Sequence, residues 1–427
     1  MQIHVVQQGQ SLYSIGQAYG IPYEDIARAN ELTDPARIVV GQALVIPITG
    51  SFHLVRPGQS LYSIARLYGT TIEELARINQ ISPTSMLQIG QRLYIPQMTK
   101  SIIDVFLYVE PRAATIESTV QEVRNRVEDL TYLGMFSYEA QRDGSLKAPP
   151  IDDIPEIAAR AGVLNAMAVT NLENFAFSPD LANFLFTNQT VQDRLFENIV
   201  QTANRIGYSD IHFDFEFVRP EDRELYNTFL RNARARFHPA GLTLSTALPP
   251  KNSDAPTGVY GGIDFAAHGE IADFVTLMTY EWGYSYSDPQ AVSPLNQVRR
   301  VVEYAVSQIP SEKIFLGQNL YGYDWTYPYP PVTGVAARAL SPKQATNLAI
   351  SRNANIQFDT VAQAPFFLYW DNNGVRHDVW FEDARSIQAK FNLIKEFNLR
   401  GIMYWKLGLA FPQNWLLLTD NFIVRKR

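Results

Sequence analysis

The chain has 427 residues, contains no cysteine and carries a formal net charge of −7. The absence of cysteine excludes thiol catalysis, thiolate metal sites and disulfides, and the negative charge argues against a nucleic-acid partner. The six histidines form no pair at i, i+3 or i, i+4 spacing, so we expect neither a histidine metal site nor a cofactor. No apolar run reaches the roughly 18 residues of a membrane helix, and the first residues lack the basic and apolar segments of a secretory signal.

The first hundred residues contain an internal repeat with a constant offset of 49 residues. Gly9-Gln10-Ser11-Leu12 recurs as Gly58-Gln59-Ser60-Leu61. Each unit is predicted to form a strand, two helices and a strand. In the second unit, Ser60 is predicted to cap the first helix, Thr71–Glu74 to form a capping box that opens the next, and Pro96 to end the closing strand.

This repeat resembles the LysM domain, a βααβ module that binds glycans containing N-acetylglucosamine. The resemblance implies LysM domains at residues 1–48 and 51–97, joined to the rest by a linker at about residues 97–100 that is short enough for the parts to pack together. It places sugar grooves between residues 9–13 and 33–38, and between 58–62 and 82–87. The implied glycan-binding residues are Gly9, Gln10, Ser11, Leu12, Gly58, Gln59, Ser60 and Leu61. The alternative is structural, with the glycines in turns and the leucines in a small core.

Residues 101–427 alternate apolar, strand-like segments with amphipathic, helical ones. The eight predicted strands are Ile103–Val109, Tyr132–Phe136, Val163–Val169, Ile211–Phe217, Leu242–Ala247, Phe274–Thr279, Ile314–Leu320 and Gly401–Trp405. This pattern predicts an α/β fold, a (β/α)8 TIM barrel. The longest gap separates strands seven and eight. It contains the hairpin signal Asp371–Gly374, so we expect a small α+β insertion at about residues 327–378.

The fourth predicted strand carries the strongest functional signal. His212, Asp214 and Glu216 alternate with apolar residues and therefore share one face, with the two carboxylates about 6–7 Å apart. Burying three polar groups is costly without a purpose. The alternative is a solvated, charged face. Strand ends converge at the mouth of such a barrel, so Glu216 is expected to meet Tyr280 and Trp405 there.

The domain resembles glycoside hydrolase family 18. Asp214 and Glu216 match the last two positions of its Asp-x-x-Asp-x-Asp-x-Glu motif, while Ser209 and His212 replace the earlier aspartates. The Met-x-Tyr-Asp motif appears as Met278–Glu281, with glutamate for aspartate, and Trp405 matches the tryptophan of the last strand.

The resemblance implies a glycosidase in which the substrate's own N-acetyl group is the nucleophile. Glu216 would be the general acid, Asp214 would orient the acetamido group, Tyr280 would donate a hydrogen bond to it, and Trp405 would form the pocket floor. The predicted substrate-binding residues are Trp405, Glu281, Trp282, Asn319, Tyr321 and His212.

Alternatives remain open for several of these residues. Trp325 is a further candidate to line a sugar subsite, and ordinary packing is the alternative for Trp405, Tyr280, Trp282, Asn319, Tyr321 and Trp325. His212 is expected to hydrogen-bond Asp214 and to titrate near neutrality, and the alternative is a purely structural histidine.

Two LysM units before this barrel resemble the spore cortex-lytic N-acetylglucosaminidases of spore-forming bacteria. That resemblance implies cleavage of the β-1,4 bond after N-acetylglucosamine in cortex peptidoglycan during germination. It also implies synthesis in the mother cell, without a signal peptide, and deposition in the spore coat or cortex. No nucleic-acid or membrane partner is expected. The sequence leaves the oligomeric state open, and a monomer is compatible with it. The alternatives are a chitinase and a non-catalytic coat protein that binds glycan.

Overall fold

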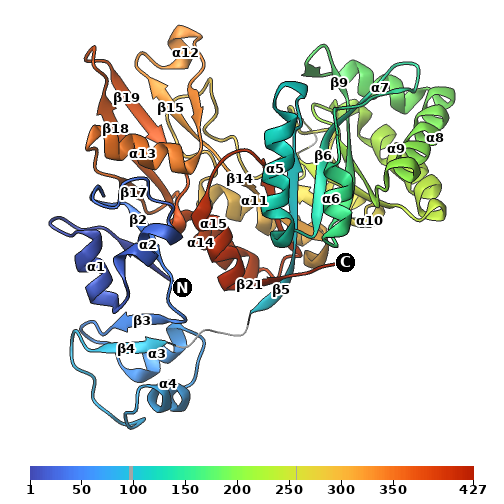
Figure 1. Ribbon diagram of the computed structural model, residues 1–427. Helices are drawn as coiled ribbons and strands as arrows, with labels where there is room; N and C mark the ends of the chain where they lie inside the picture. Colours follow the sequence, from blue (N-terminus) through green and yellow to red (C-terminus); the bar gives the residue numbers. More distant parts are fainter. Residues whose placement is uncertain (96–99, 256) are drawn as a thin grey trace.

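A computed structural model describes residues 1–95, 100–255 and 257–427. Figure 1 shows two small units at the N-terminus, followed by a large barrel domain. Residues 97–99 of the predicted linker and the predicted strand end at Pro96 lie outside the described residues. No helix in the described part of the chain is long and apolar enough to cross a membrane.

The two N-terminal units have the predicted βααβ order. The first contains β1 (Gln2–Val5), α1 (Leu12–Tyr19), α2 (Tyr23–Ala29) and β2 (Ala43–Ile46), and the second contains β3 (Ser51–Leu54), α3 (Leu61–Leu67), α4 (Ile72–Ile78) and β4 (Arg92–Ile95). Ser60 caps α3 and Thr71 caps α4. The predicted capping box at Thr71 lacks its second half, because the Glu74 carboxylate binds Arg77 instead.

Eight parallel strands close into the predicted (β/α)8 barrel, with β20 paired to β5. They are β5 (Ser101–Val109), β6 (Tyr132–Ala140), β8 (Leu164–Thr170), β11 (Asp210–Asp214), β12 (Thr243–Leu248), β13 (Phe274–Leu277), β14 (Ile314–Asn319) and β20 (Gly401–Trp405). The fourth strand is shorter than predicted. It ends at Asp214, and Phe217 takes the left-handed φ of 55°.

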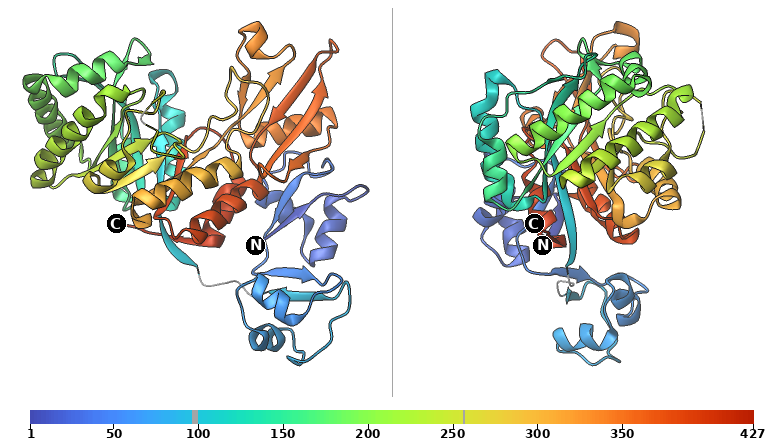
Figure 2. Two further views of the ribbon diagram at one scale, coloured as in Figure 1. Left: turned by 180° about the vertical axis from the view of Figure 1, so that it is seen from behind. Right: turned by 90° about the vertical axis from the view of Figure 1, so that its right-hand side faces the viewer.

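Helices cover the outside of the barrel (Figure 2). They are α5 (Ile116–Arg126), α6 (Ile154–Arg160), α7 (Pro179–Thr187), α8 (Gln189–Ile206), α9 (Arg223–Phe237), α10 (Phe265–Ile271), α11 (Leu295–Gln308), α14 (Ala384–Glu396) and α15 (Pro412–Asn421). A short final strand, β21 (Phe422–Val424), pairs with the start of β5. Aromatic side chains, including Phe106, Tyr132 and Phe274, form a second core inside the barrel, beneath its mouth.

The insertion between β14 and β20 folds as a five-stranded antiparallel sheet in the order β16-β15-β19-β18-β17. Its elements are β15 (Gly322–Thr326), α12 (Pro330–Thr333), β16 (Arg338–Leu340), α13 (Pro342–Arg352), β17 (Gln357–Asp359), β18 (Ala364–Trp370) and β19 (Arg376–Trp380). The sheet therefore reaches slightly beyond residues 327–378 at both ends. Figure 1 shows it standing beside the upper end of the barrel.

The first N-terminal unit packs against the barrel and the insertion. Ala43 and Val45 belong to the main barrel core, and Val39 belongs to the core of the insertion. The backbone N–H of Ile356 donates to the carbonyl of Val40 at 2.9 Å. At the equivalent positions the second unit has Arg92, Tyr94 and Gln88. The two repeats have therefore diverged at this docking surface.

Candidate active site

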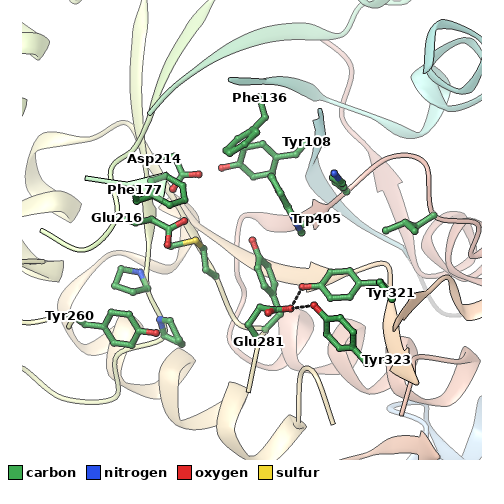
Figure 3. Close-up of a pocket in the computed structure, with 17 residues that line it drawn as sticks. Tyr108, Phe136, Phe177, Asp214, Glu216, Tyr260, Glu281, Tyr321, Tyr323 and Trp405 are labelled. Carbon is green, nitrogen blue, oxygen red and sulfur yellow. Dashed lines mark hydrogen bonds between the residues drawn. The ribbon is translucent and has the colours of Figure 1, made fainter. Parts of the chain in front are cut away.

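A pocket of about 430 Å³ lies at the C-terminal ends of the barrel strands, where a TIM barrel places its chemistry. Its walls are largely aromatic, with carboxylates among them (Figure 3). The lining residues are Tyr108, Phe136, Phe177, Asp214, Glu216, Pro249, Pro250, Tyr260, Met278, Tyr280, Glu281, Tyr321, Tyr323, Ala339, Trp405, Lys406 and Leu409.

Asp214 and Glu216 are positioned differently from a pair on one continuous strand. Asp214 is the last residue of β11, is 4% exposed, and has one carboxylate oxygen, Oδ1, with no hydrogen-bond partner. Glu216 lies beyond the strand. Its backbone N–H donates to Asn171 Oδ1 and its carbonyl accepts from Asn171 Nδ2, both at 3.0 Å. The Asn171 amide therefore replaces the strand ladder and fixes the backbone of Glu216.

The surroundings of the pair favour retention of a proton. Burial raises the pKa of Asp214 to about 7. Burial, followed by the charges of Asp214 and Glu281, raises the pKa of Glu216 well above its ordinary value. Glu216 has two carboxylate neighbours, so it is the member that holds the proton at neutral pH. A carboxylic acid that is protonated at pH 7 is suited to general acid catalysis.

Two further predicted residues lie in the same pocket. Trp405 is half-buried, and its ring packs edge-on against Phe136 and Tyr108, with centroid separations of 4.8 and 5.3 Å. Burial raises the pKa of Tyr280 well above its ordinary value, and the nearby charges of Asp214 and Glu216 add to the shift. The hydroxyl of Tyr280 therefore stays protonated and can donate a hydrogen bond to a ligand.

Glu281 stabilises another wall of the pocket by binding two tyrosines. Its carboxylate accepts hydrogen bonds from the hydroxyls of Tyr321 and Tyr323, the latter at 3.0 Å (Figure 3). Glu281 also has a left-handed φ of 67°. Backbone strain at a non-glycine residue clusters at functional sites. The wall of the pocket thus combines residues from the loop after β13 with the start of the insertion.

His212 does not contact Asp214 as expected. Its Nε2 atom lies 2.5 Å from the Tyr108 hydroxyl and its Nδ1 atom lies 2.7 Å from Ser245 Oγ. Ser245 in turn donates to Asp210 Oδ2 at 2.5 Å. Complete burial lowers the pKa of His212 to about 3, so the prediction that it titrates near neutrality is wrong.

The directions of these bonds follow from the neutral imidazole. Ser245 has a single hydroxyl proton, which it gives to Asp210, so Nδ1 of His212 carries the ring proton and Nε2 accepts from Tyr108. Burial raises the pKa of Asp210 to about 7. This hydrogen-bond chain connects a buried carboxyl group in the barrel to Tyr108 in the pocket wall.

Four residues weighed as sugar contacts lie outside the pocket lining. His212 and Asn319 are fully buried, Trp325 is buried beneath Tyr323, and Trp282 packs against the main barrel core. Asn319 donates to the carbonyl of Tyr321 at 2.6 Å. It is therefore placed to support the pocket wall rather than to touch a ligand.

Sequence reasoning missed several residues of the site. Tyr108 and Phe136 stand near the ends of the first two barrel strands, so the strand-end rule could have found them. Asn171 follows β8 directly and was open to the same inference. Asp210 and Ser245 gave no such signal, because their link runs between neighbouring strands. In the described residues, no group of three or more His, Asp or Glu side chains is placed to hold a metal ion.

In the first N-terminal unit, a groove of about 510 Å³ runs between residues 11–13 and 34–36. Its walls include Tyr13 and Tyr23, and Tyr13 is exposed. The repeated residues nearby have structural partners. Gly9 and Gly58 have left-handed φ values, and Leu12 and Leu61 are buried. Ser11 and Ser60 cap helices, and the side chains of Gln10 and Gln59 accept from backbone N–H groups in the preceding turns.

Comparisons with known proteins agree with this geometry. The model of glycosyl hydrolases family 18 matches residues 172–410, and the LysM domain model matches residues 4–47 and 53–96. The cortical fragment-lytic enzyme of Bacillus subtilis (strain 168) is 59% identical, over 100% of this chain and 99% of that protein. The crystal structure of the spore cortex-lytic enzyme SleL from Bacillus cereus has a TM-score of 0.91 at 47% identity, covering 100% of this chain and 98% of that one. A chitinase from Chromobacterium violaceum ATCC 12472 has a TM-score of 0.69 at 25% identity, covering 75% of this chain and 98% of that one. The chain therefore belongs to glycosyl hydrolases family 18, carries two LysM domains and is a glycosidase.

Proposed function

We propose that this glycosidase cleaves the β-1,4 bond after N-acetylglucosamine in spore-cortex peptidoglycan, with retention and with assistance from the substrate's acetamido group. The observation that carries the proposal is the buried pair of Asp214 and Glu216, with the pKa of Glu216 raised well above its ordinary value, in a pocket bordered by Trp405. Two carboxylates that differ in protonation divide the work of acid and electrostatic support between them.

In the first step Glu216 donates its proton to the glycosidic oxygen as the bond to the anomeric carbon breaks. The acetamido oxygen of the same sugar attacks that carbon, forming a cyclic oxazolinium ion, as is known for this type of glycosidase. Asp214 faces the acetamido N–H and stabilises the positive charge that develops there. Its unpaired Oδ1 is the acceptor available for that N–H.

Tyr280 donates its hydroxyl hydrogen to the acetamido oxygen and orients it for attack, and Trp405 supports the sugar ring and the acetyl methyl group. In the second step the ionised Glu216 accepts a proton from water, and the water oxygen attacks the anomeric carbon. The ring of the oxazolinium ion opens, and the product has the same anomeric configuration as the substrate.

The choice of cortex peptidoglycan rests on the relatives. Several relatives that align over the whole chain are named for activity on spore cortex or its fragments. The LysM domains fit the same substrate class, because a tethered binding module raises the local concentration of the enzyme on an insoluble glycan. Location in the spore coat or cortex, after synthesis in the mother cell, follows from the same proposal. The second candidate is chitin, suggested by the structural similarity to a chitinase.

The two candidates separate in one digestion experiment. Purified cortex fragments and chitin oligomers are incubated with the wild-type enzyme and with Glu216→Gln, and the products are identified by mass. We expect release of smaller cortex fragments by the wild type and none by the variant. Cleavage of chitin oligomers without cleavage of cortex fragments would contradict the proposal and favour the chitinase.

A further inference from the structure

A short hairpin beside the catalytic pocket has an unusual turn. The hairpin joins β9 (Leu172–Glu173) to β10 (Ala176–Phe177) through Asn174 and Phe175, whose φ values are 53° and 67°. A two-residue turn with both φ values positive normally uses asparagine and glycine. Phenylalanine in the second position is strained, because its Cβ crowds the neighbouring carbonyl.

Little of the fold packs against this strained residue. Phe175 is 101% exposed, and the Lys147 ammonium lies 6.0 Å from the centroid of its ring without covering it. Burial of the ring therefore contributes nothing that would offset the backbone strain. Outliers of this kind point to a role in binding.

The hairpin is attached to the catalytic acid. Asn171, which fixes the backbone of Glu216, also receives a hydrogen bond at its carbonyl from Ser178 N–H at 2.9 Å and donates from Nδ2 to the Ser178 carbonyl at 3.0 Å. The base of the hairpin and the backbone of Glu216 are thus held by one side chain.

Aromatic rings lead from the acid to the tip of the hairpin. Phe177 lines the catalytic pocket and lies next to Glu216 in Figure 3, across the pocket from Tyr321 and Tyr323. Its ring centroid is 6.4 Å from that of Phe217, which is 49% exposed. Figure 1 shows the hairpin at the upper end of the barrel, opposite the insertion.

We infer that Phe175 and Phe177 form a stacking platform for the glycan on the leaving-group side of the scissile bond. Glu216 protonates the departing oxygen, so the sugar that leaves passes along the side of the pocket where Phe177 lies. A pyranose ring presents an apolar C–H face that packs on an aromatic ring, while its hydroxyls need polar neighbours. The platform supplies both, since Arg142 binds Glu173 at 2.7 Å and Lys147 binds Glu139 at 2.9 Å around it.

This inference rests on the proposed function and predicts a length dependence. The test measures kcat/KM on a ladder of cortex oligosaccharides, from disaccharide to octasaccharide, for wild type, Phe175→Ala and Phe175→Trp. We expect Phe175→Ala to lower kcat/KM on the longest substrates about 3- to 10-fold more than on the shortest, the range for loss of one aromatic contact. Phe175→Trp should restore the wild-type dependence on length.

The matched control is Ile423→Ala, which removes another exposed apolar side chain, at 52% exposure, from the opposite end of the barrel. It should leave the length dependence unchanged. An equal effect of Phe175→Ala at every length, or no effect at any length, would overturn the platform. A wild type that cuts no member of the ladder would instead count against the proposed function. The affinity of the longest oligosaccharide for Glu216→Gln, with and without Phe175→Ala, would then show whether Phe175 contributes to glycan binding.

Discussion

His212 donates from Nδ1 to Ser245 and accepts at Nε2 from Tyr108, 2.5 Å away, so the imidazole has no nitrogen free to bind Asp214, two residues further along the chain. In the family motif this position is an aspartate. Here the neutral imidazole of His212 lies between Asp214 and Asp210 along the strand. The carboxyl group of Asp210 binds Ser245 instead of approaching Asp214. This arrangement has consequences for both stability and pH dependence.

Replacement of His212 by Asn breaks the buried chain. Tyr108 and Ser245 each lose a partner, so we expect a loss of about 1–3 kcal/mol in the free energy of unfolding. The folded pKa of His212 is about 3, below its unfolded value of about 6.5. Its contribution is therefore fully present above pH 6.5 and is lost as the pH falls toward 3. Denaturant unfolding at several pH values should show the difference between wild type and variant shrinking on acidification. A difference that grows on acidification would contradict a buried, neutral imidazole.

Asp214→Asn should stabilise the fold while abolishing activity. The folded pKa of Asp214 is about 7, compared with about 3.9 in an unfolded chain, so its ionisation above pH 4 is unfavourable in the folded state. We expect the variant to be more stable than wild type at pH 7, by at most about 4 kcal/mol, with the gap closing as the pH falls to about 4. Thermal unfolding across this range provides the measurement. A variant that is less stable than wild type at pH 7 would show that the carboxylate is favourably paired.

Asn171→Ala should reduce kcat much more than it changes KM. The amide holds the backbone of Glu216 on both sides, and a displacement of about 1 Å in a catalytic group can lower the rate about 100-fold. Asn171→Asp keeps the acceptor for Glu216 N–H but adds a negative charge, so it should also move the alkaline limb of the pH–rate profile to higher pH. Equal losses in kcat and 1/KM, with an unmoved pH profile, would show a general disruption instead.

Gly41 and Gly90 occupy equivalent positions in the two repeats, so their alanine variants test whether the first LysM domain docks on the rest of the protein. Both have a φ of 82°, so alanine strains the backbone equally at each position. A Cβ at Gly41 would lie 1.7 Å from the Ile356 carbonyl oxygen, whereas a Cβ at Gly90 meets nothing within 4 Å. We therefore expect Gly41→Ala to cost about 1–3 kcal/mol more than Gly90→Ala. It should also speed hydrogen exchange at the Ile356 amide, which donates to Val40.

The result that would contradict this docking is equal destabilisation by the two alanines, with unchanged exchange at Ile356. The first domain would then be a separate module rather than a part of the catalytic body.

The fold was predictable because its strands are apolar runs separated by amphipathic helices, and all eight predicted barrel strands are present. The residue at which the fourth strand ends was not predictable. Alternation continues through Phe217, but the ladder stops at Asp214, where Asn171 takes over the backbone of Glu216. Phenylalanine at a left-handed φ carries no sequence signal, and the same is true of Phe175 in the hairpin.

The strand-end rule brought Glu216, Tyr280 and Trp405 to one pocket. It could not assign the partners of His212. Tyr108 and Ser245 come from other strands, 104 and 33 residues away in sequence, and only the closed barrel brings them together. Divergence between the repeats was visible in the sequence at Val39 and Gln88, but its meaning depended on the surface that Val39 contacts.

If Glu216 is the acid that drives cleavage after N-acetylglucosamine, the sugar at each new reducing end identifies the bond that was cut. Cortex fragments are digested with wild type or Glu216→Gln and reduced with borohydride, and the terminal sugar alcohols are identified by mass. We expect reduced N-acetylglucosamine at every new end with the wild type, and no new ends with the variant. New ends that carry reduced muramic acid, or undiminished cleavage by Glu216→Gln, would contradict it.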